Sequence, residues 1–149
     1  MGRDREREET TSRLLTAIRN ADTFQDALSH HAPGQDPTLA QTLYEMMEKK
    51  GLAPKDMIAL TGMERSYFYH IFNGTKHPGR NMVLRIGFGL KASLAEMNCL
   101  LKVAGFSELY SKRRRDTVLI FAVTHEMTME EANDLLLEAE EEPLFMAEK

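Results

Sequence analysis

The stretch LAPKDMIALTGMERSYFYHIFNG, residues 52–74, decides the fold because it predicts two short helices joined by a glycine turn. Pro54 suits the first position of a helix, since it lacks the N–H that a first helical residue leaves unbonded. Gly62 stands where the chain needs a left-handed residue to leave that helix and turn sharply. These signals predict a helix, a turn and a second helix.

The second helix, which begins near Arg65, is predicted to have two different faces. Apolar residues at i, i+3 and i+4 form a buried stripe: Phe68, Ile71 and Phe72. The remaining positions make a polar, aromatic and basic face: Arg65, Ser66, Tyr67, Tyr69, His70 and Asn73. Such a face suits a helix that lies in the major groove of DNA.

The composition predicts an all-α protein that can bury a core. The chain has 149 residues, of which 42% are hydrophobic, with only 9 Gly and 5 Pro. β-branched residues do not alternate with polar ones over the length of a strand. No apolar run approaches the ~18 residues of a membrane span, and the charged N-terminus lacks a signal core. The single cysteine, Cys99, fits a reducing cytoplasm.

The net charge of −4 argues against DNA binding, but the charges are unevenly distributed. Residues 49–91 carry eight Lys or Arg against two acidic residues, a net charge of +6, and include the predicted helix–turn–helix. The flanking segments are acidic. A polyanion would dock on the positive block. The alternative is a solvated helix face that has collected basic residues by chance.

The N-terminal part of the chain predicts a helical extension. Residues 10–31 have a helical pattern with a break near Asn20, and HAPGQD at residues 31–36 is typical of a loop. Asp36 suits the N-cap of the next helix, with Pro37 at its first position.

Three further helices are predicted at 38–50, 82–90 and 94–104. The predicted domains are an N-terminal helical extension (1–36), a helix–turn–helix domain (37–105) and a C-terminal helical hairpin (106–149).

A repeat with a period of 35 residues occupies the second half of the chain, because residues 80–110 align without a gap on residues 115–145. The matched pairs include Arg80 with Arg115, Asn98 with Asn133, and Leu109 with Leu144. In each copy a capping box begins the second helix, Ser93 with Glu96 and Thr128 with Glu131. A chance match is the alternative, but a hairpin cannot bury its apolar face alone, so we expect a shared architectural role.

The apolar run VLIFAV at residues 118–123 predicts a helix buried on several sides. A strand is the alternative, although the sequence offers it no partner strand. We expect this run to contribute a homodimer contact through the C-terminal helices. The preceding arginines, 113–115, either contact flanking DNA or start the helix and pair with the acidic tail at 138–149.

These motifs resemble the lambda-repressor/Cro type of helix–turn–helix, the XRE family of bacterial and phage regulators, over about residues 39–104. The resemblance rests on Gly62 at the turn, Phe68 at the buried recognition-helix position and Phe72-Asn73-Gly74 at the end of that helix. Glu64 departs from the usual Ser or Thr N-cap. The resemblance implies a five-helix domain, here extended by N-terminal helices and the repeated C-terminal hairpin.

The resemblance also implies which side chains contact DNA. The base contacts are Arg65, Ser66, Tyr69 and His70. The phosphate contacts are Lys55, Tyr67, Asn73, Lys76 and Arg80. Two of these residues have an alternative interpretation without DNA: Tyr67 could pack against the fold, and His70 could be an exposed histidine with no ligand.

The sequence contains no catalytic constellation. The five histidines lack metal-ligand spacing, and no glycine-rich phosphate loop is present, so we expect no enzyme and no cofactor. The expected function is a cytoplasmic, dimeric regulator that binds double-stranded DNA sequence-specifically, with repression as the default mechanism. The alternative is a protein-interaction module that keeps the fold and no longer binds DNA.

Overall fold

The computed structural model describes residues 12–30 and 37–146, and every regular element in those ranges is an α-helix, as the composition predicts. None of these helices is long and apolar enough to cross a membrane. The chain divides into two compact units, residues 1–36 and 37–149. The second unit contains the residues of both the predicted helix–turn–helix domain (37–105) and the predicted C-terminal hairpin (106–149).

The N-terminal unit contains a helix at residues 12–20 and α2, Phe24–Ser29. The break between them lies at 21–23, close to its predicted place, and α2 is capped by Thr23, whose hydroxyl accepts a hydrogen bond from Asp26 N–H at 3.0 Å. No residue of α2 is buried. The predicted loop at 31–36 and the Asp36 N-cap lie outside the described residues.

The second unit begins with α3, Leu39–Lys50, and continues with α4, Pro54–Thr61, and α5, Arg65–Phe72. The Thr38 hydroxyl accepts from Gln41 N–H at 3.1 Å and therefore caps α3. Pro37 precedes this helix, so its predicted place as the first helical residue was wrong. Thr38 is the N-cap because its hydroxyl can accept a hydrogen bond from a backbone N–H of the first turn that has no partner within the helix.

Glycines end α3 and α4 as predicted, because both helices stop at a left-handed residue. Gly51 has φ 69° and Gly62 has φ 68°. Beyond the second turn, Phe68 and Ile71 are fully buried, whereas Phe72 is half-buried and stacks on Phe68 with ring centroids 5.8 Å apart. The predicted apolar stripe therefore anchors α5 and leaves its opposite side exposed.

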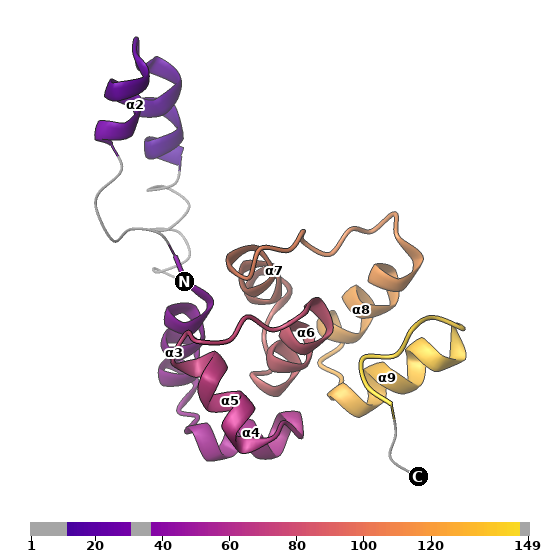
Figure 1. Cartoon of the computed structure of the whole chain (residues 1–149). Coiled ribbons are helices and arrows are strands. Elements are labelled where there is room, and N and C mark those ends of the chain that lie inside the picture. The colour runs from indigo at the N-terminus through magenta and orange to yellow at the C-terminus, as the bar shows by residue number, and fades with distance from the viewer. Residues whose placement is uncertain (1–11, 31–36, 147–149) are drawn as a thin grey trace. The chain divides into compact units, whose positions relative to one another are not determined.

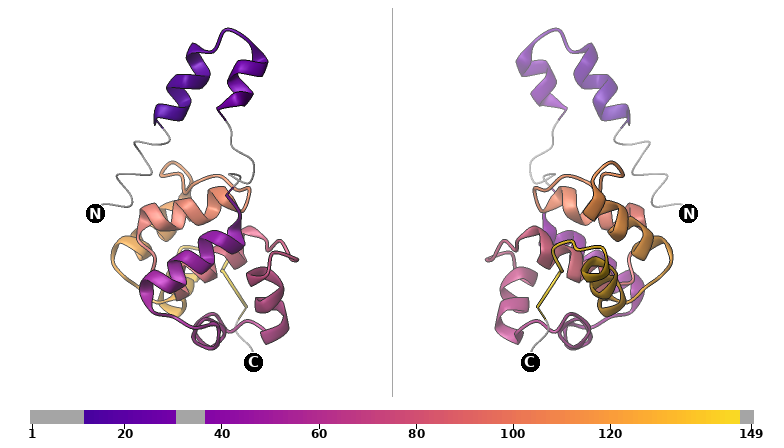
Figure 2. Two further views of the ribbon diagram at one scale, coloured as in Figure 1. Left: turned by 90° about the vertical axis from the view of Figure 1, so that its left-hand side faces the viewer. Right: turned by 90° about the vertical axis from the view of Figure 1, so that its right-hand side faces the viewer.

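Two helical hairpins complete the unit: α6, Arg80–Gly89, with α7, Leu94–Val103, and α8, Arg114–Thr124, with α9, Met129–Glu138. α6 is central, because it packs against α4, α7 and α9 (Figures 1 and 2). Gly87 permits the close approach of α7, since a side chain there would overlap that of Met97. The apolar run at 118–123 lies in α8, so the strand alternative is excluded.

The 35-residue repeat is a structural unit of two helices followed by a non-helical strap. We call residues 105–110 the first strap and residues 140–145 the second strap. The second helix of each hairpin starts at a capping box: Ser93 and Thr128 accept from the N–H of Glu96 and Glu131, and the glutamates accept from the N–H of the caps. These boxes confirm the sequence prediction.

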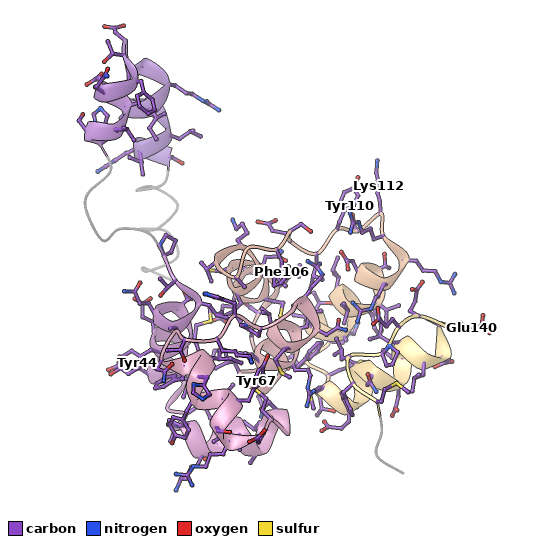
Figure 3. The ribbon with its side chains drawn as sticks, viewed as in Figure 1. Tyr44, Tyr67, Phe106, Tyr110, Lys112 and Glu140 are labelled. Atoms are coloured by element: carbon purple, nitrogen blue, oxygen red, sulfur yellow. The ribbon has the colours of Figure 1, made fainter. Side chains whose placement is uncertain are left out.

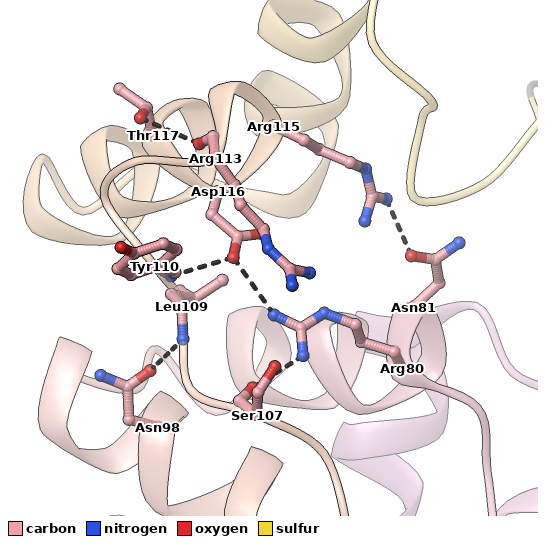
Figure 4. Close-up of polar contacts among 10 residues, drawn as sticks. All are labelled: Arg80, Asn81, Asn98, Ser107, Leu109, Tyr110, Arg113, Arg115, Asp116 and Thr117. Carbon is pink, nitrogen blue, oxygen red and sulfur yellow. Dashed lines mark hydrogen bonds and ion pairs between the residues drawn. The ribbon is translucent and has the colours of Figure 1, made fainter.

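Matched arginines hold each strap to the start of its own hairpin. Arg80 Nη1 donates to the carbonyl of Ser107 at 2.7 Å (Figure 4), and Arg115 Nε donates to the carbonyl of Glu142 at 2.9 Å. Ser107 and Glu142 are themselves 35 residues apart. The repeated arginine therefore has a repeated architectural role.

Matched asparagines make the second tether. Asn98 Oδ1 accepts from Leu109 N–H at 2.9 Å, and Asn133 Oδ1 accepts from Leu144 N–H at 2.7 Å. Both leucines are buried, at 8% and 4% exposure. A chance sequence match would not reproduce the same long-range bonds, so the repeat reflects a shared structure.

The arginines before α8 serve the second hairpin. Arg114 Nε pairs with a Glu141 carboxylate oxygen at 3.3 Å, and its Nη2 donates to the Ala139 carbonyl. This agrees with the interpretation in which the arginines start α8 and pair with the acidic tail. On α8 itself, Leu119 is fully buried while Phe121 is 45% exposed. The homodimer contact predicted for this helix stays a prediction.

Glu96 joins the first capping box to α3. Its Oε1 lies 3.1 Å from Lys50 Nζ, and Oε2 lies 3.9 Å from Lys49 Nζ. Burial acts to raise the pKa of Glu96, but the hydrogen bond from Ser93 N–H and the charges of Lys50 and Lys49 outweigh it, so the pKa lies below its ordinary value. A lowered pKa stabilises the fold above the unfolded-state pKa, and this contribution is lost as the pH falls through the folded-state pKa.

We therefore expect Glu96→Gln to lower the melting temperature at neutral pH, and the difference from wild type to shrink below about pH 4. Thermal denaturation followed by circular dichroism over a pH series measures this. Glu108→Gln is the control, because the Lys102–Glu108 pair is exposed and should contribute little. A difference that does not change with pH would show that the Glu96 charge is not the cause.

Candidate nucleic-acid interface

The exposed face of α5 carries all four side chains predicted to contact bases. Arg65, Ser66, Tyr69 and His70 are exposed, whereas Phe68 and Ile71 on the same helix point into the core. The buried stripe fixes the rotation of α5 about its axis, so the polar face cannot turn inward without exposing Phe68. The structure thus brings these four residues together on one surface.

Arg65 and Tyr69 form a pair one turn apart on this face. The Arg65 guanidinium carbon lies 5.6 Å from the centroid of the Tyr69 ring. A cation–π contact of this kind limits the positions that the long arginine side chain samples, while its N–H groups remain available to a ligand.

Ser66 is held by the residue that caps the helix. Its hydroxyl donates to Glu64 Oε1 at 2.6 Å. The capping position itself makes no side-chain hydrogen bond to the backbone, in contrast to the Ser and Thr caps of α7 and α9. The carboxylate therefore sits on the candidate interface, where its negative charge opposes a nearby phosphate.

A small hydrogen-bond network orders the end of α5. Asn73 Oδ1 accepts from Thr75 N–H at 3.1 Å and from the Thr75 hydroxyl at 2.7 Å, while His70 Nδ1 lies 3.1 Å from Thr75 Oγ1. Thr75 was not among the predicted site residues. The Asn-Gly-Thr sequence is a turn signal that could have indicated it.

Of the residues predicted to contact phosphate, Lys76 and Tyr67 lie together. Lys76 Nζ is 5.6 Å from the centroid of the Tyr67 ring, and Tyr67 is half-buried against the core. Figure 3 shows Tyr67 on the side of the unit formed by α3, α4 and α5, far from Lys112 between α7 and α8. Lys55 is exposed in the first turn of α4, so it lies at a different helix terminus.

Arg80 differs from the other predicted phosphate contacts because its guanidinium is already bound within the fold. Besides the Ser107 carbonyl, its Nη2 lies 3.5 Å from Asp116 Oδ2, and the Arg80 side chain is only 22% exposed. We therefore leave Arg80 out of the candidate interface.

The positive block of the sequence is partly neutralised in three dimensions. Lys49 and Lys50 pair with Glu96, and Arg80 pairs with Asp116, so acidic residues from outside the block compensate three of its cations. The cations left on the candidate interface are Lys55, Arg65 and Lys76, and none of them makes an ion pair with another described residue.

The described part of the chain contains no cluster of three His, Cys, Asp or Glu residues that could hold a metal ion. No protein-family model, no curated protein and no solved structure matches the chain.

Proposed function

We propose that this protein is a sequence-specific DNA-binding regulator of transcription that reads the major groove with α5. The observation that carries the proposal is the two-sided character of this helix. One side is anchored by buried Phe68 and Ile71, and the other exposes Arg65, Ser66, Tyr69 and His70 next to the glycine turn. The resemblance of this segment to lambda-repressor/Cro helix–turn–helix proteins supports the same assignment.

In this proposal, base contacts give specificity and phosphate contacts give position. Arg65 has the bidentate donor geometry that matches guanine O6 and N7. Lys76, Asn73 and the start of α4 with Lys55 would contact the sugar–phosphate backbone, where free N–H groups and cations are favoured. Regulation follows if the bound protein blocks polymerase, so repression is the default.

Binding as a dimer is part of the proposal. Two copies would place two α5 helices in successive major grooves, about one helical turn apart, on a palindromic operator. We place the dimer contact on the C-terminal helices, where Phe121 of α8 and Leu137 of α9 are 45% and 53% exposed.

Selection of bound fragments from a random double-stranded DNA library tests the proposal. We expect an enriched motif with two similar half-sites, bound less tightly as salt rises because counterions are released from phosphates. Failure to enrich any motif, together with no salt-sensitive binding to genomic fragments, would reject DNA-binding regulation.

A second candidate is a protein-interaction module on the same fold. It is favoured by the exposed apolar and aromatic residues near the helix–turn–helix, Tyr44 at 54%, Leu60 at 42% and Tyr69 at 37%, and by the acidic Glu64 among them. A protein partner whose hydrogen-exchange footprint covers α5, found for a chain that enriches no DNA motif, would establish this candidate instead.

A further inference from the structure

A pocket of about 470 Å³ lies between the first turn of α6 and the second strap. Three arginines line it, namely Arg80, Arg85 and Arg115, and only one acidic residue, Glu142, does so. Glu142 is exposed, and its carboxylate makes no ion pair with a described residue; its contact with Arg115 is through the backbone carbonyl. The residues that line the pocket therefore carry more positive than negative charge.

Two of these arginines lack a compensating carboxylate among the described residues. Arg85 Nη2 donates to the Thr61 carbonyl at 2.6 Å, its guanidinium lies 5.3 Å from the Phe145 ring centroid, and its buried Nε has no partner. Within residues 12–30 and 37–146, Arg115 donates hydrogen bonds only to neutral acceptors, the Asn81 side chain and the carbonyls of Glu142 and Pro143. Both side chains are partly buried, and withdrawing a cation from water without a counter-charge is costly.

The pKa of Arg85 reflects the absence of a nearby carboxylate among the described residues. Burial lowers the pKa of Arg85, and no opposing charge raises it. The guanidinium nevertheless remains protonated at neutral pH, as arginine does in proteins. A bound anion would remove part of the cost of burying this charge.

The repeat supplies an internal comparison. In the first copy, Arg80 has the carboxylate of Asp116 at 3.5 Å. In the second copy, the matched Arg115 has instead the neutral amide of Asn81, whose Oδ1 accepts from Nη2 at 2.8 Å (Figure 4). Asn81 is the residue that the 35-residue repeat aligns with Asp116. Arg80 thus has a carboxylate partner, whereas Arg115 has a neutral amide at the matched position.

The first turn of α6 adds favourable electrostatics. Its N-cap, Gly79, offers no side-chain hydrogen bond, and Gly79, Arg80 and Asn81 line the pocket. The N–H groups of a first helical turn lack partners within the helix, and the helix dipole is positive at this end. The N–H groups of this first turn and the guanidinium groups of Arg85 and Arg115, which have no carboxylate partner, therefore all favour an anion in the pocket.

We propose that this pocket binds a small phosphate monoester. A phosphate group carries nearly two negative charges at neutral pH, which matches the two arginines without a carboxylate partner better than a single carboxylate does. The apolar side chains of Met82 and Leu144 line the same pocket and can contact an apolar ester group. Its volume lies within the usual range for small-molecule sites. The site does not depend on DNA binding by α5.

Titration of the full chain with phenyl phosphate, in low-chloride buffer near pH 7.5 without DNA, tests the proposal by calorimetry or ³¹P NMR. We expect saturable binding of one ligand per chain. Asn81→Asp keeps the acceptor for Arg115 and places a carboxylate in the pocket, so it should weaken binding about tenfold. Glu142→Gln removes the negative charge that lines the pocket and should strengthen binding about threefold.

Two control variants make the same changes in charge outside the pocket. Asn98→Asp preserves the acceptor for Leu109 N–H, and Glu130→Gln alters an exposed residue of α9. Both should bind phenyl phosphate as wild type does. Absence of saturable binding, undiminished binding to Asn81→Asp, or equal effects of Asn81→Asp and Asn98→Asp would each overturn the proposal.

Discussion

Replacing Asp116 with alanine is expected to lower the free energy of unfolding by about 3 kcal/mol. The Asp116 side chain is 6% exposed, and its Oδ2 accepts from Tyr110 N–H at 2.9 Å and pairs with Arg80 Nη2 at 3.5 Å. Alanine would leave the mostly buried Arg80 charge without its carboxylate. That penalty is larger than the net contribution of an intact pair, because the desolvation of arginine is no longer offset.

Urea denaturation of the variants measures the loss. Asp116→Asn keeps an acceptor for Tyr110 N–H and should lose less, while Asp134→Ala, at an exposed aspartate of α9, should stay within about 0.5 kcal/mol of wild type. Arg80→Ala should lower the free energy of unfolding by less in the Asp116→Ala background than in wild type, since the two side chains share one interaction. Additive effects of these two substitutions would contradict the assigned coupling.

The sequence could predict those features of the fold that depend on residues close together in the chain. The helices, the glycines that end α3 and α4, and both capping boxes depend on residues within a few positions of each other. Thr128 and Glu131, for example, are three residues apart and bond as the motif predicts. Local signals of this kind do not require knowledge of the tertiary structure.

The tertiary polar partners could not be predicted in the same way. The repeat aligned Arg80 with Arg115, but the acceptors that matter are backbone carbonyls of Ser107 and Glu142, and any residue type can supply a carbonyl. The same limit applies to the candidate interface. A net charge of +6 over residues 49–91 indicated a cationic surface, but it did not reveal that Glu96 and Asp116 neutralise part of it.

From the proposed function we expect a second large effect: the double variant Arg65→Ala with Lys76→Ala should weaken operator binding about a hundredfold. Both side chains are exposed, both stack on a tyrosine ring of α5, and neither supports the core. The fold should therefore survive, and a loss of affinity would report on contacts with DNA. Electrophoretic shift assays with the selected operator measure it, and circular dichroism confirms that the helices are intact.

The two single variants should differ in kind because they remove different contacts. Without Arg65, discrimination at one base pair should relax by about 1–3 kcal/mol, since a bidentate guanine contact is lost. Without Lys76, binding should weaken to a similar extent on all sequences, and the slope of log affinity against log salt should fall by about one. Lys112→Ala removes the same charge far from α5 and should change neither quantity (Figure 3). If Lys112→Ala weakened binding as much as Lys76→Ala, net charge rather than the surface of α5 would explain the affinity.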